Sequence, residues 1–108
     1  TLFSLGCGRI FEGTYEQMFN SLNRIKELPR ETEIYCGHEY TLENSNFCLA
    51  NDSKNLKLKD KIVKIKKKLK NNLPTIPTTL NDEIECNVFL KAKDIMNFSK
   101  LRDLKDNF

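Results

Sequence analysis

Apolar residues recur at helical spacing in two long segments of the chain. In the first segment the steps are four, three and three residues, at Met18, Leu22, Ile25 and Leu28. This spacing places apolar side chains on one face of a helix. Thr14 and Gln17 have the form of a capping box at its start, and Pro29 stops it soon after its last apolar position. The pattern predicts one amphipathic helix between Thr14 and Pro29.

The second segment combines the same kind of spacing with many lysines. Its apolar residues follow at steps of four, three and four, at Leu58, Ile62, Ile65 and Leu69. Asp52-Ser53 offers a cap before this helix, and Asn71-Asn72 ends it. The lysines of residues 61–70 then project mostly into solvent. We favour a solvated helix face over a nucleic-acid site, because no aromatic residue interleaves the run for base stacking.

Two short segments have the composition of strands. We expect Thr1–Leu5 to be a strand end that leads into a glycine-punctuated loop at Gly6–Arg9. Thr32–Cys36 has the β-branched and aromatic residues of a short buried strand. Strand, loop and helix in this order indicate part of a layered α/β structure. Two strands are too few for a free-standing sheet, so we expect additional strands before Thr1.

After Tyr40 we expect the chain to be mainly helical. Thr41–Ala50 can form one helix, and Asn97–Asp106 a last helix with Ser99 as its candidate cap. Between them, residues 73–80 must run extended, because their two prolines each remove a hydrogen-bond donor and restrict the preceding residue.

Composition limits the class of protein. The 108 residues are 39% hydrophobic and 31% charged, as in soluble globular proteins, and no apolar run approaches the roughly 20 residues that span a bilayer. The four cysteines are widely separated, without a C-x-x-C pair, which is typical of reduced thiols in a cytosolic protein. The chain opens without methionine or a targeting segment, and we expect a processed or truncated start.

The single histidine is the main candidate for chemistry. His38 follows the apolar run Ile34–Cys36 and a glycine, at the kind of strand end that often presents catalytic or metal-binding side chains. Glu39 and Tyr40 add an acid and an amphipathic ring at the same turn. A histidine in such a place is either a ligand or a structural hydrogen-bonding residue, and the second is commoner. The turn alone does not decide between them.

Short motifs along the whole chain, taken together, are more specific evidence for a protein family than this turn alone. They are, in order, Thr1-Leu2-Phe3, Gly6-Cys7-Gly8-Arg9, Phe11-Glu12-Gly13-Thr14, Tyr35-Cys36-Gly37-His38-Glu39-Tyr40-Thr41, Pro74–Leu80, Asn87-Val88-Phe89-Leu90 and Arg102–Phe108. In this order and at these spacings they closely resemble glyoxalase II, the hydroxyacylglutathione hydrolase family. The resemblance covers nearly the full chain.

The resemblance implies an α/β fold class. Members of this family have a metallo-β-lactamase-like αββα domain followed by a mainly helical C-terminal domain. By this likeness, residues 1–40 are the incomplete end of the first domain, and residues 41–108 are the second. The family's T-H-x-H-x-D-H motif is not in this sequence, nor is the aspartate that normally precedes the residues matching Thr1-Leu2-Phe3.

The resemblance also implies an activity for a longer parent enzyme. Family members hydrolyse S-(2-hydroxyacyl)glutathione, typically the S-D-lactoyl thioester, to glutathione and a 2-hydroxy acid in cytoplasmic methylglyoxal detoxification. Two divalent metal ions, zinc with iron or manganese as alternatives, lower the pKa of a bound water from about 15.7 to about 7. His38 matches a ligand of one ion. Because a single histidine cannot hold two ions, we expect the 108-residue chain by itself to be inactive.

The same likeness assigns substrate contacts. The residues that match family positions touching glutathione are Arg9, Phe11, Tyr40, Arg102 and Lys105. Phe11 departs from the tyrosine of many relatives and lacks its hydroxyl. Arg102 and Lys105 lie three residues apart on a predicted helix, so both can reach one carboxylate. Without the likeness these residues read as surface charges and core aromatics, and Glu39 has no role beyond that of a solvent-facing or supporting acid.

The expected partner is a small-molecule glutathione thioester, bound by a monomer with no nucleic-acid or membrane partner. An alternative of another class is a non-enzymatic remnant that binds glutathione or is purely structural, because it lacks the metal site. Nucleic-acid binding through Lys64–Lys70 is the weakest alternative, since the net charge of the chain is only +3.

Overall fold

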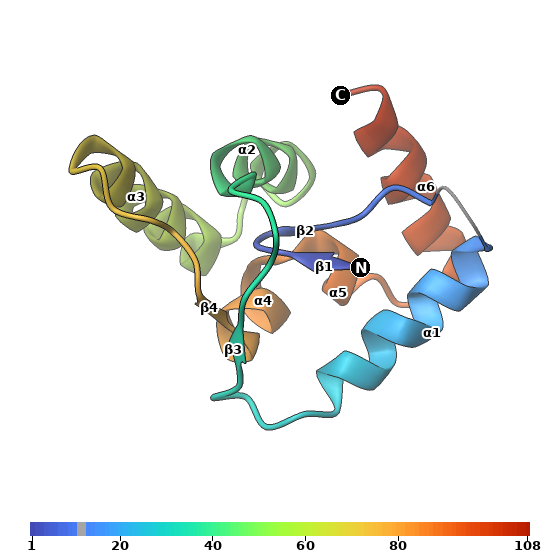
Figure 1. Ribbon diagram of the computed structural model, residues 1–108. Coiled ribbons are helices and arrows are strands. Elements are labelled where there is room, and N and C mark those ends of the chain that lie inside the picture. The colour runs from blue at the N-terminus through green and yellow to red at the C-terminus, as the bar shows by residue number, and fades with distance from the viewer. Residues whose placement is uncertain (11–12) are drawn as a thin grey trace.

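Four short strands are interspersed among helices in the computed structural model, which describes residues 1–10 and 13–108 (Figure 1). The strands are β1 (Leu2–Phe3), β2 (Gly6–Cys7), β3 (Glu33–Ile34) and β4 (Thr78–Thr79). The helices are α1 (Tyr15–Lys26), α2 (Thr41–Asn51), α3 (Leu56–Lys70), α4 (Leu80–Cys86), α5 (Val88–Lys91) and α6 (Ile95–Asp106). Within those residues, no helix combines the length and the apolar character that crossing a membrane requires.

The strands form two antiparallel pairs. β1 pairs with β2 as a tight hairpin, with Phe3 opposite Gly6. β3 pairs with β4, far along the sequence, with Ile34 opposite Thr78. The expected α/β class is confirmed in a helix-rich form. Each sheet of the described residues has only two strands, so residues 1–40 do not build an αββα layer, and β3 is instead joined to the second half of the chain.

The capping box predicted at the start of α1 is confirmed. The Thr14 side chain accepts a hydrogen bond from the Gln17 backbone N–H, and the Gln17 side chain accepts one from the Thr14 N–H at 2.9 Å. α1 ends at Lys26 and packs on α6, where the rings of Phe19 and Phe98 meet edge to face at 5.8 Å. The local signal and the apolar face therefore agree on where this helix lies.

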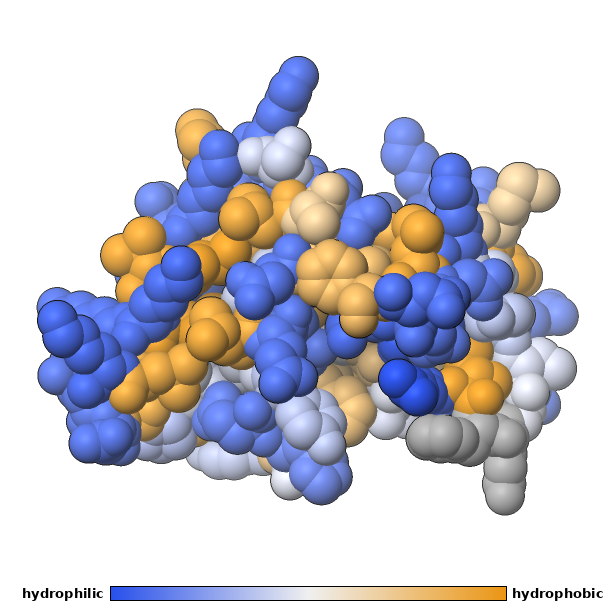
Figure 2. Space-filling view, turned by 90° about the horizontal axis from the view of Figure 1, so that it is seen from above, coloured by the Kyte–Doolittle hydropathy of each residue, from blue (hydrophilic) through white to orange (hydrophobic). Residues whose placement is uncertain are grey.

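The lysine-rich helix α3 also forms as predicted. Three residues of its apolar stripe are buried against α2 and α4: Leu58, Ile62 and Ile65. The predicted cap at Asp52-Ser53 is wrong, because Asn55 accepts the hydrogen bond from the Leu58 N–H at 3.1 Å. Asp52 instead accepts a hydrogen bond from Lys91 at 2.7 Å. Hydrophilic residues crowd the end of the molecule where α3 lies (left in Figure 2).

Two short helices, α4 and α5, were not predicted from the sequence. Residues 73–79 run extended as expected, but α4 begins at once after them, because Thr79 accepts a hydrogen bond from the Asp82 N–H at 3.2 Å. Asn87 caps α5 in the same way, through the Phe89 N–H at 3.0 Å. Both caps are local, and both helices are too short for an apolar period to reveal them.

The last helix begins two residues earlier than predicted. Asp94 accepts a hydrogen bond from the Asn97 N–H at 2.8 Å and is the N-cap of α6. The predicted cap, Ser99, lies inside the helix, where its hydroxyl donates to the Ile95 carbonyl at 2.8 Å. This back-bonding is the ordinary behaviour of a serine within a helix.

The turn between β1 and β2 is buried among the helices. Gly6 and Cys7, predicted as part of a glycine-punctuated loop, form β2 and are buried. Leu5, predicted at a strand end, is fully buried, and its φ of 60° is in the left-handed region. Gly6 allows a close approach, since a Cβ there would lie 2.7 Å from the side-chain nitrogen of Asn44. We call residues 4–8 the hairpin tip.

Side chains from the helices satisfy the backbone of the hairpin tip. Four of them come from α2, α4 and the junction of α4 with α5: Asn44, Cys48, Glu83 and Asn87. Glu83 accepts the Leu5 N–H at 2.8 Å, and Asn87 donates to the Gly6 carbonyl at 3.1 Å. Buried backbone groups need such partners, because an unmet one is as unfavourable as a lost hydrogen bond.

Glu83 is the acid at the centre of this network. It is fully buried, and burial raises the pKa of its carboxyl in spite of the hydrogen bonds that it accepts from Leu5, Asn87 and Thr78. The Thr78 bond, at 2.9 Å, joins β4 to the same carboxyl. One side chain therefore links the hairpin tip, β4 and α4.

Candidate functional site

Three rings from two distant parts of the sequence meet at one edge of the molecule. The rings of His38 and Tyr40 stack, with 5.0 Å between centroids and an interplanar angle of 12°. The Phe3 ring of β1 lies 6.1 Å from the His38 ring and 5.7 Å from the Tyr40 ring. The turn after β3 therefore lies against the β1–β2 hairpin.

A cavity of about 620 Å³ opens beside these rings. Five residues in its lining match the positions predicted to bind metal or substrate: Arg9, His38, Tyr40, Arg102 and Lys105. The sixth predicted residue, Phe11, lies outside the described residues. The structure thus brings five of the six predicted residues to one place, and we call this space the basic cavity.

Arg102 was predicted to contact substrate, and without the family likeness it would be read as a solvated charge; the structure shows it buried. Its side chain is only 3% exposed, and Nη1 donates to the carbonyl oxygens of Cys7 at 2.6 Å and Gly8 at 3.2 Å. Nη2 donates to Asp106 at 3.1 Å, whereas Nε is buried without a partner among the described residues. Most of this guanidinium therefore fastens the hairpin tip to α6, and its Nε is not exposed either.

The other two cations of the basic cavity are more open. Arg9 has a side chain that is 62% exposed, with Nε 3.7 Å from Asp106. Lys105 lies with Nζ 6.0 Å above the Phe47 ring and forms no ion pair with the residues that the structure describes. Since Asp106 is shared by two arginines, the cavity keeps an excess of positive charge.

The Cys7 thiol lies in the same lining, 3.5 Å from Nη1 of Arg102. Burial raises the pKa of this thiol, and the neighbouring arginine offsets the effect only in part. The group is therefore a neutral thiol near pH 7. None of the four cysteines is in a disulfide.

Glu39 has a structural role that the sequence did not indicate. Its carboxylate accepts hydrogen bonds from the Thr75 N–H at 3.1 Å, from the Thr75 hydroxyl, and from the Thr41 hydroxyl at 3.0 Å. Burial acts to raise the pKa of Glu39, but these bonds together with Lys68 outweigh it and hold the pKa below its usual value. Thr75 lies too far along the chain to be recognised as a partner from spacing.

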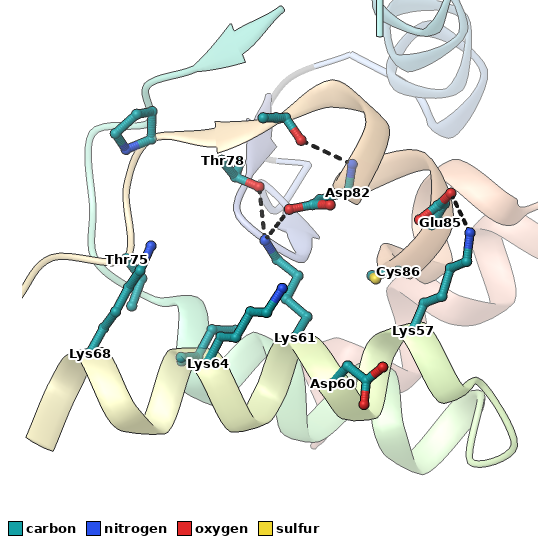
Figure 3. A pocket seen from close by; sticks show the side chains of 13 residues that line it. Lys57, Asp60, Lys61, Lys64, Lys68, Thr75, Thr78, Asp82, Glu85 and Cys86 are labelled. Atoms are coloured by element: carbon teal, nitrogen blue, oxygen red, sulfur yellow. Dashed lines mark hydrogen bonds and ion pairs between the residues drawn. The ribbon is translucent and has the colours of Figure 1, made fainter. Parts of the chain in front are cut away.

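A second cavity, of about 370 Å³, lies between α3 and the segment that leads through β4 into α4 (Figure 3). Ion pairs bridge it: Lys61 lies 3.1 Å from Asp82, and Lys57 lies 2.7 Å from Glu85. Lys61 also donates to the Thr78 hydroxyl at 3.2 Å. None of the predicted site residues lines this cavity, and its paired charges hold α3 in place.

The described residues do not make a complete metal centre. Among residues 1–10 and 13–108, no group of three or more histidine, cysteine, aspartate or glutamate side chains is placed so that it could hold a metal ion. His38 is a single imidazole beside the basic cavity. It can supply one ligand, whereas a protein site for a catalytic zinc ion commonly has three.

Comparisons with known proteins agree on one family. A family model described as "Hydroxyacylglutathione hydrolase C-terminus" matches residues 39–108. This match begins one residue after His38 and includes Tyr40, Arg102 and Lys105.

Curated proteins named hydroxyacylglutathione hydrolase are similar to nearly the whole chain. The one from Pelagibacter ubique (strain HTCC1062) is 66% identical over 108 residues, which are 100% of this chain and 45% of that protein. The one from Prochlorococcus marinus (strain MIT 9312) is 52% identical over 106 residues, or 98% of this chain and 43% of that protein. The one from Mesorhizobium japonicum (strain LMG 29417 / CECT 9101 / MAFF 303099) is 43% identical over 122 residues, or 100% of this chain and 48% of that protein. The chain spans less than half the length of each.

Proposed function

The chain belongs to the hydroxyacylglutathione hydrolase family, whose C-terminal model its residues 39–108 match, and we propose that it is the C-terminal part of such an enzyme. The complete enzyme would hydrolyse S-(2-hydroxyacyl)glutathione, such as the S-D-lactoyl thioester, to glutathione and a 2-hydroxy acid. Its N-terminal part would be a metallo-β-lactamase-like domain that ends within residues 1–40. The chain's share of its curated relatives, 45% in the Pelagibacter protein, leaves room for that domain.

One observation carries this proposal: Arg9, Tyr40 and Lys105 line the same basic cavity as His38. Glutathione carries two carboxylates and several amides, so its site needs cations and hydrogen-bond donors. The volume of about 620 Å³ lies within the roughly 300–1,000 Å³ that small-molecule sites usually enclose. The cavity therefore has both the charge and the size that this ligand requires.

Each residue of the basic cavity can be given a role. Lys105 and Arg9 would bind carboxylate oxygens through charge-assisted hydrogen bonds. Tyr40 would contact the peptide through its ring and hydroxyl. Phe11 lies outside the described residues, and its contact through the ring alone stays a prediction. Arg102 would add its positive charge to the lining of the basic cavity while Nη1 holds the hairpin tip.

His38 would supply one ligand to a metal centre of the complete enzyme. The expected pair of divalent ions, zinc with iron or manganese as alternatives, needs further ligands that the described residues do not provide. No catalytic step can therefore be derived from this chain alone.

A non-enzymatic glutathione-binding module is the second candidate. It is favoured by the make-up of the basic cavity, which gathers several groups suited to glutathione but, among the described residues, only one candidate metal ligand. A polypeptide of these 108 residues would then bind glutathione without hydrolysing its thioesters.

Calorimetric titration of the 108-residue chain with glutathione tests the proposed binding site. Lys105→Met should weaken binding by about tenfold to hundredfold, because a charge-assisted hydrogen bond contributes roughly 1.5–3 kcal/mol. Lys66→Met is the matched control, since Lys66 is an exposed lysine of α3 and does not line the basic cavity. It should leave the affinity within about twofold. Absence of binding by the unaltered chain, or equal losses in the two variants, would contradict the proposal.

A further inference from the structure

The turn that carries His38 and Tyr40 has few attachments to the rest of the molecule. Tyr35, at its start, is 72% exposed, and a Cβ built on Gly37 would meet no atom within 4 Å. Gly37 through Tyr40 are all exposed. Something other than burial must therefore hold the two rings in one orientation.

Two kinds of contact hold this turn across the fold. One is the packing of the Phe3 ring against the rings of His38 and Tyr40. The other is the set of hydrogen bonds that Glu39 accepts from Thr75. Stacking restrains the distance between two ring planes but opposes sideways movement of the rings only weakly. Two directional hydrogen bonds to one residue restrict the position of the Glu39 carboxylate more closely.

The place of Glu39 in the chain makes its bonds matter for both neighbours. His38 and Tyr40, two residues apart, stack on the side of the basic cavity, and Glu39 between them reaches Thr75 instead. Thr41, the first residue of α2, donates to the same carboxylate. We call the hydrogen bonds that Glu39 accepts from Thr75 and Thr41 the clamp.

We infer that Glu39 is a positioning residue: by holding Thr75 and Thr41 it fixes the stacked rings of His38 and Tyr40 at the basic cavity. The effect on ligand affinity rests on the proposed function, whereas the effect on the rings does not. Thr75 belongs to the segment that precedes β4 and lines the cavity under α3, so the clamp ties the turn to the helical half of the chain.

Two readouts on the 108-residue chain separate these claims. Nuclear Overhauser contacts and ring-current shifts of the His38 and Tyr40 protons report the stack directly. Calorimetry with glutathione reports its consequence for binding. If the unaltered chain does not bind glutathione, the proposed function fails, and the ring signals still decide the role of Glu39.

Glu39→Ala should abolish the contacts between the His38 and Tyr40 rings and weaken glutathione binding at least tenfold. Glu39→Gln should keep both, with affinity within about threefold, because an amide can still accept from the Thr75 N–H and donate to a hydroxyl oxygen. Glu43→Ala is the matched control: it removes an exposed glutamate four residues away, on the first turn of α2.

Thr75→Val adds a variant that keeps the backbone donor and removes only the hydroxyl. It should weaken the ring contacts less than Glu39→Ala, and Thr75→Ser should restore them. The inference is overturned if Glu39→Ala leaves the ring contacts intact in a folded chain. It is equally overturned if Glu39→Ala proves unfolded and Thr75→Val leaves the ring contacts unchanged, or if the losses in Glu39→Ala match those in Glu43→Ala.

Discussion

The hairpin tip and α3 are held to the protein in opposite ways. Buried polar side chains bind the backbone of residues 4–8, and their partners lie between 40 and 95 positions away along the chain. The helix α3 is held by an apolar stripe, with exposed lysines on its other side and ion pairs at its edge. An apolar stripe tolerates rearrangement, whereas a buried polar network loses stability when any one partner is removed.

The difference bears on function, because the basic cavity lies on the side of the hairpin tip. Cys7 and Gly8 of the tip line it, and Arg102 joins them to α6. A rigid backbone is needed where ligand groups must be held in place. The basic surface of α3 has no such constraint.

The largest effect should come from Glu83→Ala. It removes the acceptor for the Leu5 N–H, the Asn87 amide and the Thr78 hydroxyl at once. We expect the free energy of unfolding to fall by about 3–5 kcal/mol, since each unmet buried group costs about 1–3 kcal/mol. Urea denaturation followed by circular dichroism measures this loss. A loss below about 1 kcal/mol would show that the network does not hold the tip.

Arg102→Met should have the next largest effect on stability. The variant removes the donor to the carbonyl groups of Cys7 and Gly8 and leaves Asp106 with only the exposed Arg9 beside it. We expect a loss of about 2–3 kcal/mol in the same measurement. Lys105→Met, one turn away, should change stability by less than about 0.5 kcal/mol. Equal losses in the two variants would contradict the assignment of Arg102 to the tip.

The pH dependence of stability should reveal the buried carboxyl. Because burial holds the pKa of Glu83 above its usual value of 4.5, the folded chain keeps a proton that the unfolded chain releases at lower pH. The contribution of this group is therefore complete below about pH 4.5 and is lost as the pH rises through its folded pKa. Unfolding of the unaltered chain and of Glu83→Gln should be compared from about pH 4 to pH 8. As the pH rises over that range, the variant should gain stability relative to the unaltered chain. A constant difference in the free energy of unfolding would show that the pKa of Glu83 is not raised.

The smallest effect should come from the exposed side of α3. Lys66→Ala removes an exposed charge from a helix that its apolar stripe holds in place. We expect a change in the free energy of unfolding within about 0.5 kcal/mol, as for most surface substitutions. A loss comparable to that of Arg102→Met would erase the contrast between the two regions.

The same contrast explains what could be predicted from the sequence. α1 and α3 were predicted because an apolar period is a local signal, and the capping box of Thr14 is local as well. The caps of α3 and α6 were misplaced by a few residues, since aspartate, asparagine and serine compete for the same position. α4 and α5 were missed because neither is long enough to show a period.

Several residues selected as site candidates lie together in the structure, but their contacts were not predicted. Family resemblance selected Arg9, His38, Tyr40 and Lys105, which line one cavity. The burial of Arg102 and the clamp of Glu39 could not be predicted, because their partners are backbone and hydroxyl groups of distant segments. No spacing rule links such groups before the fold is known.

A chimaera gives the most direct test of the account. The N-terminal part of the Pelagibacter ubique relative, which is 66% identical over this region, would be joined to these 108 residues, and hydrolysis of S-D-lactoylglutathione would be measured with and without added zinc. The account predicts metal-dependent hydrolysis by the chimaera, a fall of more than about 100-fold with His38→Ala, and none by the 108-residue chain alone. A folded chimaera without activity, or one whose rate is unchanged by His38→Ala, would contradict it.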